Sequence, residues 1–328
     1  MEKAIRDRFN DGILDEARRR YGIAADQIHL LDGFESFMYA FTKDGGDYIL
    51  RLGHSRRRSP ELIRGEVDWI NYLAAGGAGV AKAVLSENGE LVEEIPDGQG
   101  GMFLATAFVK AQGGPVWQMG GWTDDLMVKY GRLLGRMHHL SKQYTPGNPA
   151  WKRGTWQDRN NLGLEQIIPA EETAVLARYH EVMSHLNTLP ETADNYGMIH
   201  QDAHGGNFFV DAAGNITLFD FDDCCYGHFA YDLAMVLFYV TTNHPEPVKF
   251  GEHFWHHFLH GYYQENDLDR HWLRELPHFM KLREIDLYAI INRDFDSLEG
   301  DGWVQTYMRG RKERIEQGIP YVEMAFGD

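Results

Sequence analysis

The sequence predicts an α+β fold, in which a small antiparallel sheet is followed by a larger, mainly helical part. Two observations indicate this organisation. Short runs of β-branched and aromatic residues, separated by turn-forming residues, recur before residue 110. Beyond residue 115 the apolar residues mostly keep helical spacing, apart from two short β-rich runs near residue 210. The segment Ala-Gln-Gly-Gly-Pro at 111–115 is the expected hinge, so we predict an N-terminal lobe over 1–110 and a C-terminal lobe over 111–328.

The N-terminal lobe is expected to begin with one helix over 3–21, whose apolar residues keep helical spacing. A second helix is expected over 60–75, where Ser59 suits the N-cap and Pro60 the first helical position. The runs expected to form the sheet are 28–34, 37–43, 48–52, 84–85, 91–95 and 102–109.

Composition excludes some partners. The 328 residues are 43% hydrophobic and 25% charged, as in ordinary soluble proteins. A formal net charge of −17 argues against nucleic acid, because phosphate contacts need clustered Lys and Arg, but it is compatible with a cationic substrate. No apolar run approaches the roughly 18 residues of a membrane span, so no membrane partner is expected.

Two features predict a cytoplasmic setting. The first residues, Met-Glu-Lys-Ala-Ile-Arg-Asp-Arg, lack the apolar run of a signal peptide. The chain has two cysteines, Cys224 and Cys225, and a disulfide between neighbours is strained, so both are expected to be reduced.

The helix expected over 60–75 carries an acidic residue on its apolar face. At about 100° per residue, Glu66 lies near the middle of the arc formed by Leu62, Ile63, Trp69, Ile70 and Leu73. A carboxylate on a buried face needs a cationic partner or becomes protonated. The nearest suitable donor is Arg51, in the strand before the helix, and we expect the two to pair.

A hairpin near residue 210 is expected to gather side chains that handle protons and metal ions. If 208–210 and 216–219 pair about their turn-forming connection, Asn207 falls opposite Phe219 and beside Asp220. Asp202 lies on the loop just before. Phosphoryl transfer needs such a set: one carboxylate to accept the alcohol proton, and a carboxylate with an amide oxygen to hold Mg²⁺.

The order of these residues resembles the aminoglycoside phosphotransferase family, which includes choline-kinase-like and homoserine-kinase-like enzymes. The family's His-x-Asp-x-x-x-x-Asn loop is matched by His200, Asp202 and Asn207. Its metal-binding Asp, in Asp-Phe-Gly or Asp-Phe-x-Asp, is matched by Asp220, and its loop-bracing Asp by Asp232 in Tyr-Asp-Leu-Ala. Two positions depart from the pattern: Gln201 replaces a common Gly, and Asp222 stands where many relatives have Gly.

The resemblance implies a two-lobed protein-kinase-like fold and an ATP-dependent phosphotransferase, with GTP as the alternative nucleotide. Asp202 is then expected to orient and deprotonate the acceptor alcohol, and His200 to support the loop. Asn207 and Asp220 are expected to hold Mg²⁺, with Asp222 as a further contact. The acceptor is left open between a small-molecule alcohol, cationic or not, and a protein Ser/Thr.

The resemblance also assigns the N-terminal lobe to nucleotide binding. Arg51 stands where a Lys is usual and is expected to contact the phosphates, positioned by Glu66; a purely structural bridge is the alternative.

The loop over 31–37 is expected to cover the phosphates with Gly33 and Ser36, although it has one glycine where the kinase pattern has three. Thr106 and Phe108, just before the hinge, are expected to meet the adenine edge through their backbone groups.

Two other functions remain open for this cluster. His200, Asp202 and His204, with the aspartates Asp220, Asp222 and Asp223, are also compatible with a Zn²⁺ or two-metal hydrolase. A pseudokinase that binds nucleotide without transfer is the second alternative, because of Arg51 and the atypical phosphate loop.

Three further clusters are expected to lie on the surface. His253, His257 and His260 share a helix face opposite the apolar one; a cleft wall and a zinc site are the alternatives. The run Arg56-Arg57-Arg58 is expected to be solvated, with ATP steering as its alternative. An acidic and aromatic patch is expected to be a solvated loop or an ammonium-binding site: Asp294, Asp296, Glu299, Asp301 and Trp303.

Overall fold

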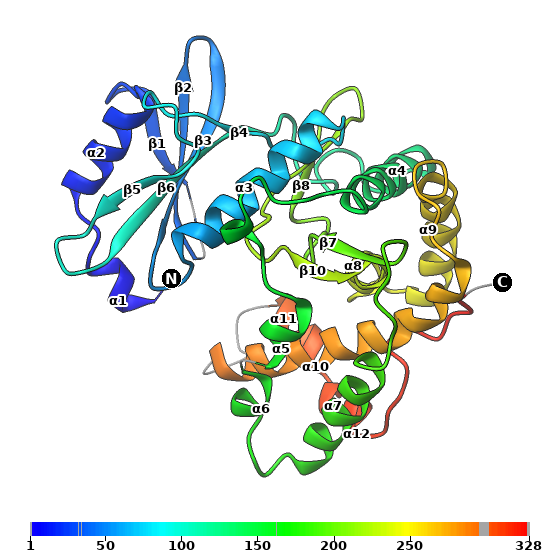
Figure 1. The fold of residues 1–328 in the computed structure, drawn as a ribbon. Coiled ribbons are helices and arrows are strands. Elements are labelled where there is room, and N and C mark those ends of the chain that lie inside the picture. The colour runs from blue at the N-terminus through cyan, green and yellow to red at the C-terminus, as the bar shows by residue number, and fades with distance from the viewer. Residues whose placement is uncertain (1, 32, 34, 162, 295–301, 327–328) are drawn as a thin grey trace.

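The computed structural model describes the chain except for residues 1, 32, 34, 162, 295–301 and 327–328. Figure 1 shows a smaller lobe, made of an antiparallel sheet with helices on either side, and a larger, mainly helical lobe. The predicted α+β, two-lobed fold is confirmed.

Within the described residues, the sheet of the smaller lobe has six antiparallel strands in the order β1-β2-β3-β6-β4, with β5 paired to β6. The strands are β1 (Ile28–Leu31), β2 (Phe37–Lys43), β3 (Gly46–His54), β4 (Ala83–Val84), β5 (Glu93–Pro96) and β6 (Met102–Val109). β2 and β6 have the bounds expected from the sequence. β1 ends at Leu31, three residues before the expected end of that run, and residues 32 and 34 of the run lie outside the described part.

The single helix expected over 3–21 is wrong, because the structure has two: α1 (Lys3–Arg6) and α2 (Asp11–Tyr21). Asn10 adopts an extended conformation, and its side chain accepts a hydrogen bond from the backbone N–H of Ile13 at 3.3 Å. This is an N-cap, which starts a new helix. The apolar spacing continues across the break because both helices pack onto the same sheet core.

Helix α3 (Pro60–Ala75) has the predicted bounds, and the Ser59 hydroxyl accepts from the N–H of Leu62 as an N-cap. The sheet separates two cores. One face packs with α1 and α2, whereas α3, on the other side, contributes to the main core that continues into the larger lobe. Figure 1 shows α3 lying between the sheet and the larger lobe, so the larger lobe is built directly against it.

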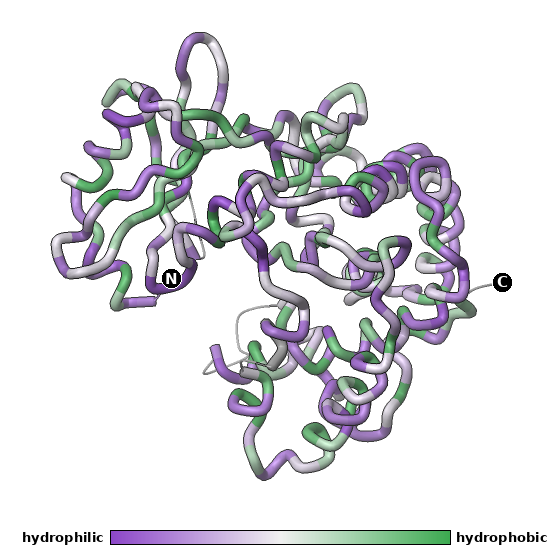
Figure 2. Tube along the Cα trace, in the orientation of Figure 1, coloured by the Kyte–Doolittle hydropathy of each residue, from purple (hydrophilic) through white to green (hydrophobic). Residues whose placement is uncertain are grey.

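The larger lobe is built around the apolar helix α8 (Phe229–Thr241), in which eleven of thirteen residues are buried. In Figures 1 and 2, α8 lies inside the lobe among the other helices. The surrounding helices are α4 (Asp124–Ser141), α5 (Trp156–Asn161), α6 (Leu164–Ile167), α7 (Thr173–Leu186), α9 (Pro247–Tyr262), α10 (Leu276–Asp294), α11 (Gly302–Met308) and α12 (Arg311–Glu316), with the short 3-10 helices η1 (Pro149–Trp151) and η2 (Arg270–Glu275). Among the described residues, none of the helices has the length and apolar character that crossing a membrane requires.

Two small antiparallel pairs complete the larger lobe. β7 (Tyr196–Ile199) pairs with β10 (Cys225–His228), and β8 (Phe208–Val210) pairs with β9 (Ile216–Leu218). The register of β8 and β9 places Phe208 opposite Leu218, and the N–H of Phe219 donates to the carbonyl of Asn207 at 2.9 Å. The predicted hairpin is therefore confirmed, with Asn207 opposite Phe219.

The β8–β9 hairpin is also bonded to a segment of the smaller lobe and to the expected hinge. The N–H of Ala81, just before β4, donates to Leu218 at 2.8 Å, and Leu218 donates to Gly79 at 2.9 Å. On its other strand, Val210 donates to Gly114 of the expected hinge at 2.8 Å and accepts from it at 3.2 Å. Backbone hydrogen bonds therefore connect both strands of the hairpin to the smaller lobe or its connection.

Gly113→Ala is expected to destabilise the protein more than Gly45→Ala. Both glycines have a positive φ, which costs an L-residue about 1–2 kcal/mol. Only at Gly113 would the added Cβ collide with a backbone atom, the carbonyl oxygen of Val210, whereas Gly45 has open space. We expect a further loss of about 1–3 kcal/mol at Gly113, measured by urea unfolding. Equal losses at the two positions would contradict a tight contact at the hinge.

Candidate active site

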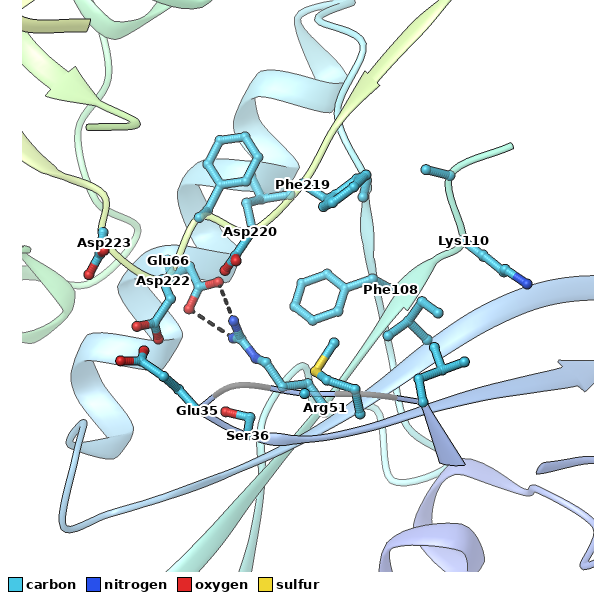
Figure 3. Close-up of a pocket in the computed structure, with 18 of the residues that line it drawn as sticks. Glu35, Ser36, Arg51, Glu66, Phe108, Lys110, Phe219, Asp220, Asp222 and Asp223 are labelled. Atoms are coloured by element: carbon cyan, nitrogen blue, oxygen red, sulfur yellow. Dashed lines mark hydrogen bonds and ion pairs between the residues drawn. The ribbon is translucent and has the colours of Figure 1, made fainter. Parts of the chain in front are cut away.

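A cavity of about 670 Å³ lies between the sheet of the smaller lobe and the segment that follows β9. Figure 3 shows acidic side chains from both lobes gathered near Arg51 at one end of it. The predicted site residues that line the cavity are Gly33, Ser36, Arg51, Glu66, Phe108, Asp202, Asp220 and Asp222. The structure therefore brings residues from widely separated parts of the chain to one place.

Arg51 and Glu66 form the predicted pair. The two guanidinium nitrogens Nη1 and Nη2 donate to the two carboxylate oxygens of Glu66, each at 2.8 Å, and Glu66 is fully buried. The third nitrogen, Nε, donates to the Thr106 hydroxyl at 3.2 Å, and the guanidinium lies over the Phe108 ring. Such a fork-to-fork contact fixes the guanidinium plane, which a Lys could not do.

Thr106 lies behind Arg51 and is not among the residues that line the cavity, unlike Phe108 and the following Val109, Lys110 and Ala111. The side chain of Thr106 orients Arg51 in this structure, while the contact of its backbone with the adenine edge stays a prediction. Gly33 and Ser36 do lie on the cavity wall, and a Cβ at Gly33 would collide with the carbonyl oxygen of Ser36, so this turn is tight.

The loop that carries Asp202 is held by Asp232, which is completely buried. The carboxylate of Asp232 accepts the backbone N–H of His200 at 2.8 Å and that of Gln201 at 2.6 Å. It also contacts Nε2 of His138 at 3.2 Å. Gln201 has a φ of 70°, in the left-handed region that favours glycine, which explains why Gly is common at this position in the family.

His200 is occupied on both sides of its ring. Its Nδ1 accepts the backbone N–H of Asp202 at 3.3 Å, and its Nε2 lies 3.1 Å from the carbonyl oxygen of Phe219, to which it donates. Both ring nitrogens thus tie the loop to the end of the hairpin. This geometry fits a supporting role for His200 and leaves neither nitrogen for proton transfer.

Asn207 lies beside Asp202. The amide nitrogen of Asn207 donates to the Asp202 backbone carbonyl at 2.9 Å and to its carboxylate at 3.1 Å. Because the NH₂ group is committed to these contacts, the amide oxygen is the atom left to bind a cation. Amide and carboxylate oxygens are the ligands that Mg²⁺ prefers, so Asn207, Asp220 and Asp222 fit such an ion.

Arg283 is a partner of Asp202 that sequence reasoning missed. It projects from α10, is buried, and its Nη2 donates to the Asp202 carboxylate at 2.9 Å. The same guanidinium pairs with Asp286 at 2.7 Å and with the Tyr239 hydroxyl. Burial opposes ionisation of Asp202, but contacts with His204 and Arg283 outweigh it and hold its pKa well below the ordinary value. Asp202 is therefore ionised at neutral pH.

The environments of Asp220 and Asp222 shift the pKa values of the two carboxyl groups in opposite directions. Burial raises the pKa of Asp220 to about 6, against the attraction of Arg51, and its backbone has a positive φ of 63°. Burial also opposes ionisation of Asp222, but Arg58, Arg57 and Arg51 outweigh it and lower its pKa to about 2.

The run Arg56-Arg57-Arg58 is not a solvated surface as expected, because two of its members face the cleft. The guanidinium of Arg57 lies 2.6 Å from the Asp222 carboxylate and also contacts Glu35. Arg58 contacts Asp222 at 3.1 Å and Asp223 at 2.9 Å. Arg56 is exposed, as expected. Because the arginines and these aspartates are far apart in the sequence, no local pattern predicted their contacts between the lobes.

The cleft geometry does not favour a metallohydrolase. A metal ion held by three His, Cys, Asp or Glu side chains needs their ligand atoms close together. Among the described residues, the sets of three with ligand atoms within 4.8 Å of one another lie outside the cleft. They are Asp124 with His253 and His257, and His185 with Glu275 and His278.

His253 and His260 are exposed as predicted, and His257 is half-buried. His253 contacts Asp124 at 2.8 Å and His257 contacts it at 3.5 Å. In the expected acidic and aromatic patch, Asp294 pairs with Arg293 and Trp303 stacks on Tyr307. Its other members, Asp296, Glu299 and Asp301, lie outside the described residues.

The fold and the cleft together define a protein-kinase-like phosphotransferase. A family model for the phosphotransferase enzyme family matches residues 27–276, and the chain belongs to that family. It is a phosphotransferase with an alcohol group as acceptor, as the sequence predicts.

Two comparisons extend along nearly the whole chain at substantial identity. Amicoumacin kinase of Bacillus subtilis (strain 168) is 38% identical over 331 residues, which cover 99% of this chain and 98% of that protein. The structure of amicoumacin kinase hAmiN in complex with AMP-PNP, Ca²⁺ and Ami has a TM-score of 0.93 and 37% identity, and covers 99% of both chains. The structure of a microcompartment-associated aminopropanol kinase has a TM-score of 0.76 and 24% identity, and the match covers 94% of this chain and 97% of that chain. This likeness shows that the two proteins share a fold.

Asp220→Asn is expected to stabilise the ligand-free protein at neutral pH. Because the folded-state pKa of Asp220 is raised, its ionisation destabilises the fold; this cost is absent below about pH 4, grows up to about pH 6 and is then constant. We expect a gain of about 1–3 kcal/mol at pH 7.5 that shrinks towards pH 4.5, measured by urea unfolding across that range.

The matched control is Asp222→Asn, two residues further along. The lowered pKa of Asp222 contributes stability that is present above about pH 4 and is lost only as the pH falls towards 2. Its removal should therefore destabilise the protein at both pH 5 and pH 7.5. Effects of the same sign for the two variants would contradict the assigned environments.

Proposed function

We propose that this phosphotransferase transfers the γ-phosphoryl group of ATP to a hydroxyl of a small molecule, with amicoumacin or an amino alcohol as the acceptor. The observation that carries the proposal is the convergence of Asp202, Asp220 and the Arg51–Glu66 pair on one cavity. The 38% identity with amicoumacin kinase over nearly the full chain supports the acceptor, and the AMP-PNP in the hAmiN complex supports an adenine nucleotide over GTP.

Asp202 acts as the base in this proposal. Its carboxylate is held by Arg283 through one oxygen and by Asn207 through the other, so it is fixed in direction before the acceptor binds. An ionised carboxylate at this place orients the alcohol and accepts its proton as the phosphoryl group is transferred. His200 keeps the loop in position through its two ring nitrogens.

Asn207, Asp220 and Asp222 would hold Mg²⁺ through oxygen atoms. A bound Mg²⁺ supplies positive charge that neutralises the phosphates and aligns them for transfer. Arg51, fixed by Glu66, lies where it can contact the phosphates, and Gly33 and Ser36 lie on the same wall of the cavity. Phe108 and the residues after it line the part of the cavity proposed for the base, and this lining supports a lobe boundary at 110–111.

Asp202→Asn should abolish transfer while nucleotide binding survives. Loss of the base is expected to lower kcat by about a hundredfold or more, with the Kd for Mg-AMP-PNP unchanged within about twofold. Asp220→Ala should instead lose Mg²⁺-dependent nucleotide binding. Calorimetry and a labelled-ATP assay measure the two effects, with the exposed Asp267→Asn as a control that leaves both unchanged.

An acceptor panel with labelled ATP tests the substrate. Amicoumacin, 1-amino-2-propanol and an aminoglycoside are compared under the same conditions, and the product is identified by the added phosphoryl group in mass spectrometry. We expect turnover of amicoumacin or the amino alcohol well above the rate of ATP hydrolysis alone. Tight Mg-ATP binding without transfer to any panel member would contradict the proposed acceptor class.

A further inference from the structure

Arg57 projects into the nucleotide cavity from the turn between β3 and α3. Both of its ion pairs use one nitrogen, Nη2, which contacts Glu35 beside the expected phosphate loop and Asp222 of the larger lobe. Its side chain is 21% exposed and that of Asp222 is 13% exposed. The guanidinium thus lies at the acidic end of the cavity and connects the two lobes.

The other cations on the cavity wall are less able to bind a triphosphate at the acidic end of the cavity. Arg51 has its charge compensated by the bidentate contact with Glu66, and its Nε is bound to Thr106. Lys110 lies beside the hinge, and in Figure 3 it is on the other side of the cavity from Asp222 and points away from it. Arg57 is the remaining cation among the described residues that line the cavity.

Among the described residues, carboxylates outnumber these cations on the cavity wall. Besides Glu66, the carboxylates that line it are those of Glu35, Asp202, Asp220, Asp222 and Asp223. A triphosphate carries several negative charges, so its binding among these carboxylates requires metal cations and protein cations near its oxygens. Arginine suits this task because its planar fork binds carboxylate and phosphate with the same geometry.

We propose that Arg57 is a phosphate-binding residue that moves from Glu35 and Asp222 to the phosphates when the metal–nucleotide complex binds. The proposal rests on the proposed function. In the ligand-free protein Arg57 neutralises Asp222; once Asp222 turns to the metal, Arg57 is released to the phosphate oxygens. This contact supplies charged donors beside the loop over 31–37, in which Gly33 is the one glycine.

The neighbouring arginines have different roles. Arg58 contacts Asp222 and Asp223 together and lines a smaller space behind the main cavity, so it anchors the 222–223 segment to the start of α3. Arg56 is exposed and makes no contribution to the cavity wall. Arg56→Gln is therefore a matched control for Arg57→Gln, with the same change of charge one residue away.

Calorimetry with Mg-AMP-PNP and with adenosine separates phosphate binding from effects on the fold. For Arg57→Gln we expect the Kd of Mg-AMP-PNP to rise about tenfold or more, since a charge-assisted contact is lost, and that of adenosine to change less than about twofold. Arg56→Gln should change neither. Unchanged adenosine binding shows that the Arg57 variant is folded.

The affinity for Mn²⁺ alone is a second measurement, and it should rise where the affinity for Mg-AMP-PNP falls. Removal of Arg57 takes one of the two arginine contacts from Asp222 and leaves that of Arg58, so Arg57→Gln should bind Mn²⁺ several-fold more tightly than the wild type, measured by electron paramagnetic resonance of free Mn²⁺. An unchanged ratio of the AMP-PNP and adenosine affinities in Arg57→Gln would overturn the role of Arg57, even if the wild type phosphorylates its acceptor. Absence of metal-dependent AMP-PNP binding in the wild type would instead overturn the proposed function itself.

Discussion

The site depends on a buried carboxylate, Asp232, that has backbone N–H groups as partners. By accepting the N–H groups of His200 and Gln201, it holds Gln201 in a left-handed conformation that a non-glycine residue rarely adopts. That conformation directs the chain so that Asp202 faces the cavity. Without the carboxylate, two buried donors would be left unsatisfied, at a cost of about 1–3 kcal/mol each. The position of the proposed base is therefore set from helix α8, inside the core.

Charge is distributed unevenly between the lobes. Arg51, Arg57 and Arg58 at the acidic end of the cleft all come from the smaller lobe, and the aspartates they face come from the larger lobe. Attraction across the cleft holds the two sides of the site together, while burial raises the pKa of Asp220 and so disfavours its ionised form. A bound cation favours the ionised carboxylate, so this environment suits a residue that is proposed to hold a metal ion.

Local sequence patterns predicted much of the site, but they did not predict contacts between residues far apart in the chain. The register of the β8–β9 hairpin and the pairing of Arg51 with Glu66 follow from spacing within a few dozen residues, and the structure has both. Arg283 lies 81 residues from Asp202, and nothing near it in the sequence marks its partner. The break before α2 was readable in principle, because Asn10 is a strong N-cap residue, but the uninterrupted apolar spacing concealed it.

The hydrogen bonds of the β8–β9 hairpin constrain where the smaller lobe can lie. One strand is bonded to residues 79–81 and the other to Gly114. A displacement that broke these bonds would leave backbone donors and acceptors unpaired, which is costly away from water. Asn207 and Asp220, which flank the open end of this hairpin, are therefore tied through the backbone to the segments that border the sheet.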